Sequence, residues 1–144
     1  MDDLGHVNVV CDASDRARWT KEMIAPRNDR VVFVAVTVGE VVGAAKTDFH
    51  PDPNGSAPAG HYLGGVVVAP EFRRRGVGSA LTRARVEWIW SRASSAYYFA
   101  NEYNTASIRM HETLGFLPRA RFAEIHGVTA DDGRSELVLF EASR

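Results

Sequence analysis

The sequence feature that most constrains the fold is a strand, a basic turn and an amphipathic helix that follow one another between residues 61 and 93. The run His61–Val68 (HYLGGVVV) is rich in valine, as strands are, and holds a glycine pair in its middle. Such a pair often marks a bulge or the close approach of a ligand. Over Val77–Ala93, apolar residues recur every three or four positions, which predicts a helix with one buried face. Because the aromatic run Ala96–Asn101 follows directly, we expect a parallel strand pair joined by this helix.

Shorter patterns on either side complete the predicted fold. The β-rich runs Val31–Val38 and Val41–Phe49 are separated by Gly39-Glu40, which suits a type II′ hairpin turn. The other expected elements are a strand over Asn8–Cys11, a helix over Arg16–Ile24, a helix over Thr105–Leu114, and closing strands over Phe116–His126 and Ser135–Ala142. Together they predict an α/β fold of the α+β type, with a mixed, mostly antiparallel central sheet and helices on both faces.

Composition limits the class of protein. The 144 residues fit one domain over residues 1–144, and the 45% hydrophobic and 24% charged content argues against wholesale disorder. No apolar run approaches the roughly 20 residues that span a bilayer, and the acidic N-terminus does not resemble a signal peptide. We therefore expect a cytoplasmic protein with no membrane partner. The single cysteine, Cys11, excludes an internal disulfide and is expected to be a small buried hydrophobe. The five histidines show no metal-ligand spacing, so no metal site is predicted.

Charge is balanced over the whole chain but not along it. The formal net charge of −1 argues against a protein that binds nucleic acid over its whole surface. Between residues 73 and 92, however, six arginines stand against one glutamate, a net charge of +5, which suggests a local anionic partner. The other interpretation is a solvated helix face formed by Arg83, Arg85, Glu87 and Arg92. A nucleic-acid contact is disfavoured because the block is short and includes the turn described next.

The turn Arg73–Gly78 (RRRGVG) is suited to hold an anion. The first amides of the helix that follows have no intrahelical partner, and the helix dipole adds partial positive charge there. Gly76 and Gly78 let a ligand approach the backbone, and the three arginines offer bidentate contacts to phosphate. We therefore predict a pyrophosphate site. The GxxxxGK[ST] loop of P-loop enzymes is absent, and the third glycine of the dinucleotide fingerprint is missing.

Two motifs resemble those of the GNAT superfamily of N-acetyltransferases. The turn Arg73–Gly78 matches the [RQ]xxGx[GA] loop of the family, and the run Asn104–Phe116 (NTASIRMHETLGF) is similar to its second signature, NxxxI…LGF. The resemblance covers residues 64–116 and implies an acyltransferase that uses acetyl-CoA. It also implies that a bulge splays the parallel strand pair apart. We place this bulge at Gly64-Gly65, where an amide could polarise the acetyl carbonyl.

The resemblance assigns the contacts to acetyl-CoA residue by residue. In the family, the loop amides hold the pyrophosphate of coenzyme A, and the preceding strand holds the pantetheine arm through its backbone. The corresponding positions are Arg73, Arg74, Arg75, Gly76, Val77, Gly78 and Ser79 for the pyrophosphate, and Val66, Val67 and Val68 for the pantetheine. On the second helix, one face holds Asn104, Ser107, Ile108 and His111, and we expect Asn104, Ser107 and His111 to lie beside the pantetheine. Ala106, Met110 and Leu114 are expected to face the core.

The chemistry of acetyl transfer asks for an acid and a base. An alkylamine with a pKa of about 10.4 must lose a proton to attack, and a leaving thiolate with a pKa of about 8.5 gains from protonation. The family usually has tyrosine at the position that matches His111, and we predict that His111 protonates the thiolate. The alternative is that His111 is a structural histidine. For the general base, Glu102 is the first choice and His61 the second.

The predicted activity is transfer of an acetyl group to a primary amine of a small molecule. Asp48, Asp52 and Glu102 could attract a cationic acceptor, in a cleft lined by loop 49–60, the start of the splayed strand and the segment after Phe116. One alternative is an acyl-CoA-binding sensor or regulatory module that has lost turnover, because histidine replaces tyrosine. Another is a protein N-terminal or lysine acetyltransferase. The resemblance also allows a homodimer, with the closing strands as pairing edges.

Overall fold

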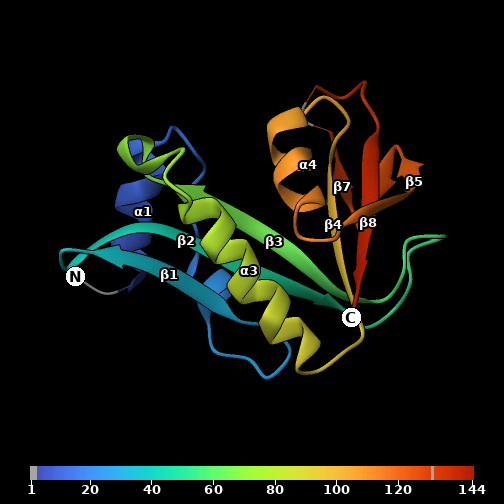
Figure 1. Cartoon of the computed structure of the whole chain (residues 1–144), viewed down its shortest axis with the longest axis horizontal. Coiled ribbons are helices and arrows are strands. Elements are labelled where there is room, and N and C mark those ends of the chain that lie inside the picture. Colours follow the sequence, from blue (N-terminus) through green and yellow to red (C-terminus); the bar gives the residue numbers. More distant parts are fainter. Residues whose placement is uncertain (1–2, 131) are drawn as a thin grey trace. The chain divides into compact units, whose positions relative to one another are not determined.

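The computed structural model describes residues 3–130 and 132–144 (Figure 1). The elements are α1 (Asp3–Ala13), α2 (Lys21–Ile24), β1 (Val32–Thr37), β2 (Glu40–His50), β3 (Gly60–Val68), a 3₁₀ turn (Pro70–Phe72), α3 (Val77–Trp90), β4 (Ser95–Asn101), α4 (Thr105–Glu112), β5 (Leu117–Phe122), β6 (Glu124–Ile125), β7 (Val128–Thr129) and β8 (Leu137–Ser143). The main sheet has the strand order β1-β2-β3-β4-β8-β5. Its pairs β1–β2, β4–β8 and β5–β8 are antiparallel, and β3–β4 is parallel. The predicted mixed, mostly antiparallel sheet is thus confirmed.

The chain divides into two compact units, each made of two segments. The first unit holds the described residues of 1–48 and 64–88, and the second holds those of 49–63 and 89–144. The first therefore contains α1, α2, β1, most of β2 and α3, and the end of β3. The second contains β4, α4, β5 to β8, and the start of β3. The expected single domain over residues 1–144 stays a prediction.

In the first unit, helices cover both faces of β2. Val42 and Ala44 are buried in a core that includes Val7, Val10 and Cys11 of α1. Residues of a strand alternate between faces, so Gly43 points the other way. A Cβ atom added there would lie 3.1 Å from Val77 and 3.3 Å from Leu81, both of α3. Cys11 is fully buried, as predicted, and burial raises the pKa of its thiol.

The prediction of a strand over Asn8–Cys11 was wrong, because this run lies inside α1. Leu4, Val7 and the pair Val10-Cys11 recur at helical spacing and pack into the core. The run was predicted as a strand because its β-branched valines are typical of strands. Asn8 then fixes the following chain, since its side-chain Nδ2 donates to the Trp19 carbonyl (3.1 Å) and its Oδ1 accepts from the Trp19 amide (2.8 Å).

Two further expectations in the first unit are corrected. The helix predicted over Arg16–Ile24 is shorter, because Thr20 caps it and accepts from the Met23 amide at 3.4 Å. The hairpin turn is centred on Val38-Gly39, with Thr37 paired to Glu40. Both central residues have positive φ (50° and 74°), which is the pattern of a type I′ turn rather than type II′.

The second unit is built on β4, whose residues alternate between two packed faces. Tyr97 and Phe99 pack against the buried cluster that contains Tyr62 and Ile125. Tyr98 lies on the opposite face, with α4. β3 joins this unit through the parallel register His61 with Ala96 and Tyr62 with Tyr97.

The closing segment differs from the prediction in one detail. The strand expected over Phe116–His126 is divided into β5 and β6, and β6 turns back onto β7. His126 and Gly127 have φ values of 47° and 85°, which no regular strand adopts. α4 ends at Glu112 with Thr113 as its C-cap, two residues earlier than the predicted end at Leu114, and Gly115 follows with a φ of 94°.

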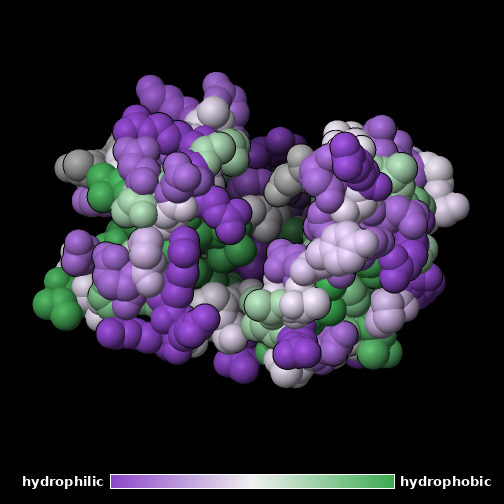
Figure 2. Space-filling model, turned by 90° about the horizontal axis from the view of Figure 1, so that it is seen from above, coloured by the Kyte–Doolittle hydropathy of each residue, from purple (hydrophilic) through white to green (hydrophobic). Residues whose placement is uncertain are grey.

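Hydrophilic side chains cover most of the face seen in Figure 2, with apolar atoms in separate small patches. Among the described residues, no helix has the length and apolar character needed to span a bilayer.

Candidate functional site

The turn before α3 has the open backbone that an anion site requires. Arg74 and Gly76 have φ values of 62° and 82°, so the chain reverses sharply before the helix. The first helical hydrogen bond runs from the Ala80 amide to the Gly76 carbonyl (3.0 Å). The amides of residues 77–79 therefore have no intrahelical acceptor. A Cβ atom added at Gly76 or Gly78 would meet nothing within 4 Å. A ligand can thus reach these amides from outside.

The three arginines of the turn are exposed and add positive charge around it. No ion pair among the described residues includes Arg73, Arg74 or Arg75. The Arg75 guanidinium lies 5.5 Å from the centre of the Phe72 ring, which gives it a cation–π contact. Since no carboxylate within residues 3–130 and 132–144 pairs with these side chains, their charge is available to an anion.

The predicted pantetheine strand presents its three valines differently. Val66 is 37% exposed, whereas Val67 is buried in the core of the first unit. The Val68 carbonyl accepts a hydrogen bond from Ser14 Oγ at 3.0 Å. Because the Val67 side chain is buried, Val67 could contact a ligand only through its backbone. The Val68 carbonyl oxygen already accepts one hydrogen bond.

The glycine pair of β3 is explained in part by a carboxylate from the neighbouring strand. A Cβ atom added at Gly64 would lie 2.6 Å from Asp48 Oδ2. Asp48 is held there by Lys46, whose Nζ is 2.7 Å from Asp48 Oδ1. At Gly65, an added Cβ atom would meet Lys46 Cε at 3.7 Å and Trp19 Cζ2 at 3.8 Å. The close neighbour at Gly64 is thus the side chain of Asp48, and the bulge and ligand contact expected at the glycine pair stay predictions.

Arg85 was expected on the solvated face of α3, and this was wrong. Its side chain is 1% exposed. The guanidinium Nη1 donates to the carbonyls of Lys46 and Gly64, both at 3.1 Å. Arginine is usually exposed, so the residue type gave no signal of burial. The signal lay in its spacing, because Arg85 lies four residues after Leu81 and four before Ile89, which are both buried.

In the second unit, His111 is the one residue of α4 that is fully buried. Its Nδ1 lies 2.7 Å from the Ser107 carbonyl, and because a carbonyl only accepts, Nδ1 carries the proton. Nε2 is therefore the ring atom that can gain or lose one. The imidazole stacks on the Tyr98 ring at 3.5 Å between centres, and the Tyr98 hydroxyl is hydrogen-bonded to the Ser107 hydroxyl. This contact between His111 and Tyr98 was not predicted from the sequence.

The rest of α4 is placed partly as predicted. Ser107 and Ile108 are half-buried on the side of His111, whereas Asn104 is exposed at the start of the helix. Its side chain makes no capping hydrogen bond. Ala106 is exposed rather than in the core, so the buried face of α4 is centred on His111.

The two candidate bases have different surroundings. Glu102, just after β4, is paired through Oε2 with Arg121 Nη1 at 2.6 Å. A hydrogen bond with Glu102 also raises the pKa of the exposed Tyr103. His61, in β3, is 9% exposed and packs on the Phe49 ring at 4.7 Å between centres. Glu102 is thus already engaged with a cation, and His61 is largely shielded from solvent.

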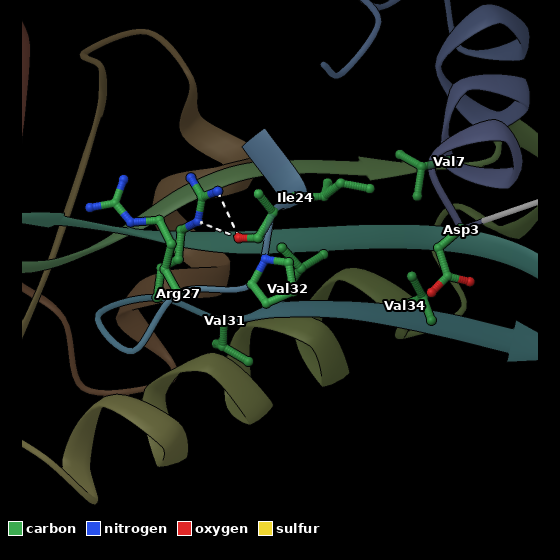
Figure 3. A pocket seen from close by; sticks show the side chains of 10 residues that line it. Asp3, Val7, Ile24, Arg27, Val31, Val32 and Val34 are labelled. Atoms are coloured by element: carbon green, nitrogen blue, oxygen red, sulfur yellow. Dashed lines mark hydrogen bonds between the residues drawn. The ribbon is translucent and has the colours of Figure 1, made fainter. Parts of the chain in front are cut away.

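Each unit has a cavity of its own. In the first, a pocket of about 350 Å³ lies among α1, α2 and β1, with Val7, Ile24, Val32 and Val34 among its walls (Figure 3). None of the predicted site residues lines it. In the second, a cavity of about 90 Å³ is lined by Ser56, Pro58, Tyr97, Arg119, Ala120, Leu139 and Glu141. Two of its walls come from the loop and the segment that were predicted to contact the acceptor.

Comparisons with known proteins agree with these features. The model of the acetyltransferase (GNAT) family matches residues 7–116. A mycothiol acetyltransferase of Thermobispora bispora is 33% identical over 120 residues, which cover 77% of this chain and 40% of that protein. The chain thus spans about two fifths of the length of this curated relative.

Two solved structures share the fold at low identity. The ribosomal-protein-S18-alanine N-acetyltransferase of Escherichia coli has a TM-score of 0.74 and 19% identity, with 98% of this chain and 87% of that chain covered. A Bacillus anthracis protein assigned as a streptothricin acetyltransferase, in complex with acetyl coenzyme A, has a TM-score of 0.67 and 15% identity, with 90% of this chain and 70% of that chain covered. Acetyl-CoA is the cosubstrate of this family. Because the family model matches most of its length, the chain belongs to the GNAT family of acetyltransferases.

Proposed function

We propose that this protein transfers the acetyl group of acetyl-CoA to a primary amine of a small molecule. The observation that carries the proposal is the helix start at residues 76–79. Its first amides have no intrahelical acceptor, both glycines face open space, and the arginines beside it form no ion pair with any described residue. This is the place where the motif of the family expects a pyrophosphate. The relative from Thermobispora bispora is named a mycothiol acetyltransferase, and mycothiol is a small molecule, which supports a small-molecule acceptor.

The first unit would hold most of coenzyme A. Residues Gly76, Val77, Gly78 and Ser79 would donate amides to the pyrophosphate, and Arg73, Arg74 and Arg75 would contact the phosphates through their guanidinium groups. The backbone of Val66, Val67 and Val68 would bind the pantetheine arm. Asn104 and Ser107 are proposed to contact the cofactor from α4. The open cradle at Gly76 and Gly78 fits this ligand, because a side chain at either position would fill it.

We propose direct attack of the amine on the thioester. His111 is the proposed acid for the leaving thiolate, and Nε2 is the atom that would deliver the proton, since Nδ1 is used by the Ser107 carbonyl. Glu102 and His61 are the proposed bases. Glu102 would have to loosen its pairing with Arg121 to take a proton, and His61 would take one on a ring nitrogen.

The acceptor would bind against loop 49–60 and the segment after Phe116. The cavity of about 90 Å³ in the second unit supports this position, because Ser56 and Pro58 of the loop and Arg119 of the segment line it. Cytoplasmic location and pairing into a homodimer remain predictions from the sequence.

A second candidate is an acetyl-CoA-binding module without turnover. The burial of His111 and its bond to the helix backbone favour it, because these contacts are also what a purely structural histidine would make.

One experiment separates the two candidates. Binding of CoA and acetyl-CoA is measured by calorimetry, and release of the CoA thiol is then followed with a panel of primary amines that includes amino sugars, polyamines, amino acids and N-terminal alanine peptides. We expect micromolar binding and turnover with a non-peptide amine. Binding without turnover on the whole panel would favour the module, turnover only with peptides would overturn the acceptor class, and absence of binding would overturn the proposal.

A further inference from the structure

This inference concerns Arg85 and rests on the proposed function. Its guanidinium is buried inside the first unit and uses all three nitrogens. Nη1 donates to the Lys46 and Gly64 carbonyls at 3.1 Å, Nε donates to the Leu81 carbonyl at 3.3 Å, and Nη2 donates to Thr82 Oγ1 at 3.0 Å. One side chain of α3 thus joins the backbone of β2 to that of β3.

The bond to Gly64 fixes the direction of a peptide plane. All peptides of the described residues are trans, so the Gly64 carbonyl and the Gly65 amide point in opposite directions. With the carbonyl held by Arg85, the Gly65 amide must point away from that guanidinium. Glycine has many accessible backbone conformations, and Asp48 excludes a side chain at Gly64 that would restrict them. The hydrogen bond from Arg85 therefore restrains the backbone conformation of the glycine pair, which no side chain restricts.

The same guanidinium is connected to the pyrophosphate turn. Thr82, which is fully buried, accepts from Arg85 and donates through Oγ1 to the Gly78 carbonyl at 2.8 Å. A short chain of hydrogen bonds therefore runs from Gly64 through Arg85 and Thr82 to Gly78. It fixes the distance between the glycine pair of β3 and the start of α3.

We propose that Arg85 is a positioning residue that aims the Gly65 amide at the thioester carbonyl of acetyl-CoA. In the reaction, the amine nitrogen bonds to the carbonyl carbon and the carbonyl electron pair moves onto oxygen. The C–S bond then breaks, the pair returns to form the amide, and the thiolate takes up a proton equivalent to the one that the amine loses. The Gly65 amide stabilises the oxygen while it carries the charge, and Arg85 keeps that donor in place.

The test compares Arg85→Lys with the exposed Arg83→Lys of the same helix. Lysine keeps the charge but cannot reach both strand carbonyls and Thr82 at once. Loss of one oxyanion donor lowers kcat by roughly 10²–10³-fold in known cases, and we expect about 10²-fold for Arg85→Lys, with the dissociation constant for CoA within about threefold. Arg83→Lys should leave both unchanged. Thr82→Val should weaken CoA binding more than it lowers kcat.

A spectroscopic readout separates positioning from general loss of structure. The infrared carbonyl band of bound acetyl-CoA, labelled with ¹³C at the carbonyl, should lie below that of the free thioester in the wild type and move back toward it in Arg85→Lys. A wild-type measurement needs no variant: the Gly65 amide proton should shift downfield with acetyl-CoA but not with S-ethyl-CoA, which lacks the carbonyl. This second measurement decides the matter if Arg85→Lys fails to fold.

The outcomes distinguish this inference from the proposed function. If the wild type binds and turns over acetyl-CoA but Arg85→Lys keeps its kcat and its carbonyl band, the role of Arg85 is overturned alone. The same holds if the Gly65 amide shifts equally with both ligands. If the wild type binds no CoA, the proposed function fails first, and the role of Arg85 fails with it.

Discussion

The two units present their predicted functional residues in different ways. In the first, the groups that matter are backbone atoms: amides at residues 77–79, the glycine pair of β3, and carbonyls held by Arg85. In the second, they are side chains that already have partners, such as His111 on Tyr98 and Glu102 with Arg121. A backbone site is recognisable from its glycines, whereas the role of a side chain depends on neighbours that are distant in the sequence. The predictions below test this difference.

The largest effect is expected at Gly78 in the first unit. Gly78→Asp would place a carboxylate at the amides proposed to hold the pyrophosphate, where open space admits it without strain. Hydrogen bonds to charged groups contribute roughly 1.5–3 kcal/mol each, so loss of two should weaken CoA binding by about 10³-fold. The melting temperature should not fall, because an acidic residue suits a helix start. Calorimetry and thermal unfolding would measure both effects.

The matched control is Gly78→Asn, which has the same shape without the charge. It should lose about tenfold or less in affinity. Equal losses of CoA affinity in the two variants would mean that the bulk of the side chain rather than its charge is responsible. Full affinity in Gly78→Asp would show that the pyrophosphate does not bind at this helix start.

The second prediction concerns His111, whose proposed role as an acid must be distinguished from a purely structural role. His111→Phe keeps the stacking on Tyr98 but loses the bond to the Ser107 carbonyl, whereas His111→Asn offers a donor in place of Nδ1 but cannot titrate. If His111 is the acid, both variants should lose about 10²-fold in kcat, and one limb of the pH–rate profile should disappear. Normal kcat in His111→Asn together with a loss in His111→Phe would assign His111 a structural role.

The third prediction returns to the backbone of the first unit. Gly64→Ala would bring a methyl group to 2.6 Å from Asp48 Oδ2, and overpacking of this kind costs about 1–3 kcal/mol of unfolding free energy. Asp48→Ala in the same chain should recover most of the loss, since it removes the clashing atoms. Urea unfolding of the two single variants and the double variant would measure the coupling. Simple additivity would show that Asp48 is not what requires glycine at this position.

Much of the first unit was predictable because its requirements are local. Gly76 and Gly78 stand beside a strand and before a helix with clear apolar spacing, and the structure agrees with that interpretation. The failures also have local causes. The valines within Asn8–Cys11 favour strands in general, but burial at helical spacing outweighed that preference. Arg85 was assigned to solvent because a buried cation is rare without several acceptors, and its acceptors come from two strands.

The second unit was less predictable because its contacts join distant parts of the chain. His111 was placed on the correct helix, but its partner Tyr98 comes from the adjacent strand and could not be identified from spacing. The pairing of Glu102 with Arg121 likewise depends on how β4 and β5 are brought to the same side of the sheet. These neighbours decide whether a group acts as an acid, a base or a structural contact, so the catalytic assignments remain proposals while the fold is confirmed.

The smallest expected effect lies at Tyr62 in the core of the second unit. Its side chain is 1% exposed, and its hydroxyl donates to the Pro58 carbonyl at 2.6 Å. Tyr62→Phe should therefore cost about 1 kcal/mol at neutral pH. Burial also raises the pKa of Tyr62 well above its ordinary value near 10. The unfolded chain then releases this proton first, so the wild type should lose stability above about pH 10, by up to about 1.4 kcal/mol per pH unit.

Tyr62→Phe lacks this ionisable hydroxyl. The deficit in its unfolding free energy relative to the wild type should therefore shrink and then reverse as the pH rises from 7 to 11. The comparison is best made in a Cys11→Ala background, because burial also raises the pKa of that thiol and its loss of stability has the same direction. Urea unfolding at each pH gives the difference between the two proteins. A difference that stays constant up to pH 11 would mean that the Tyr62 hydroxyl ionises as easily in the folded chain as in the unfolded one, and that its burial is relieved by local opening of the second unit.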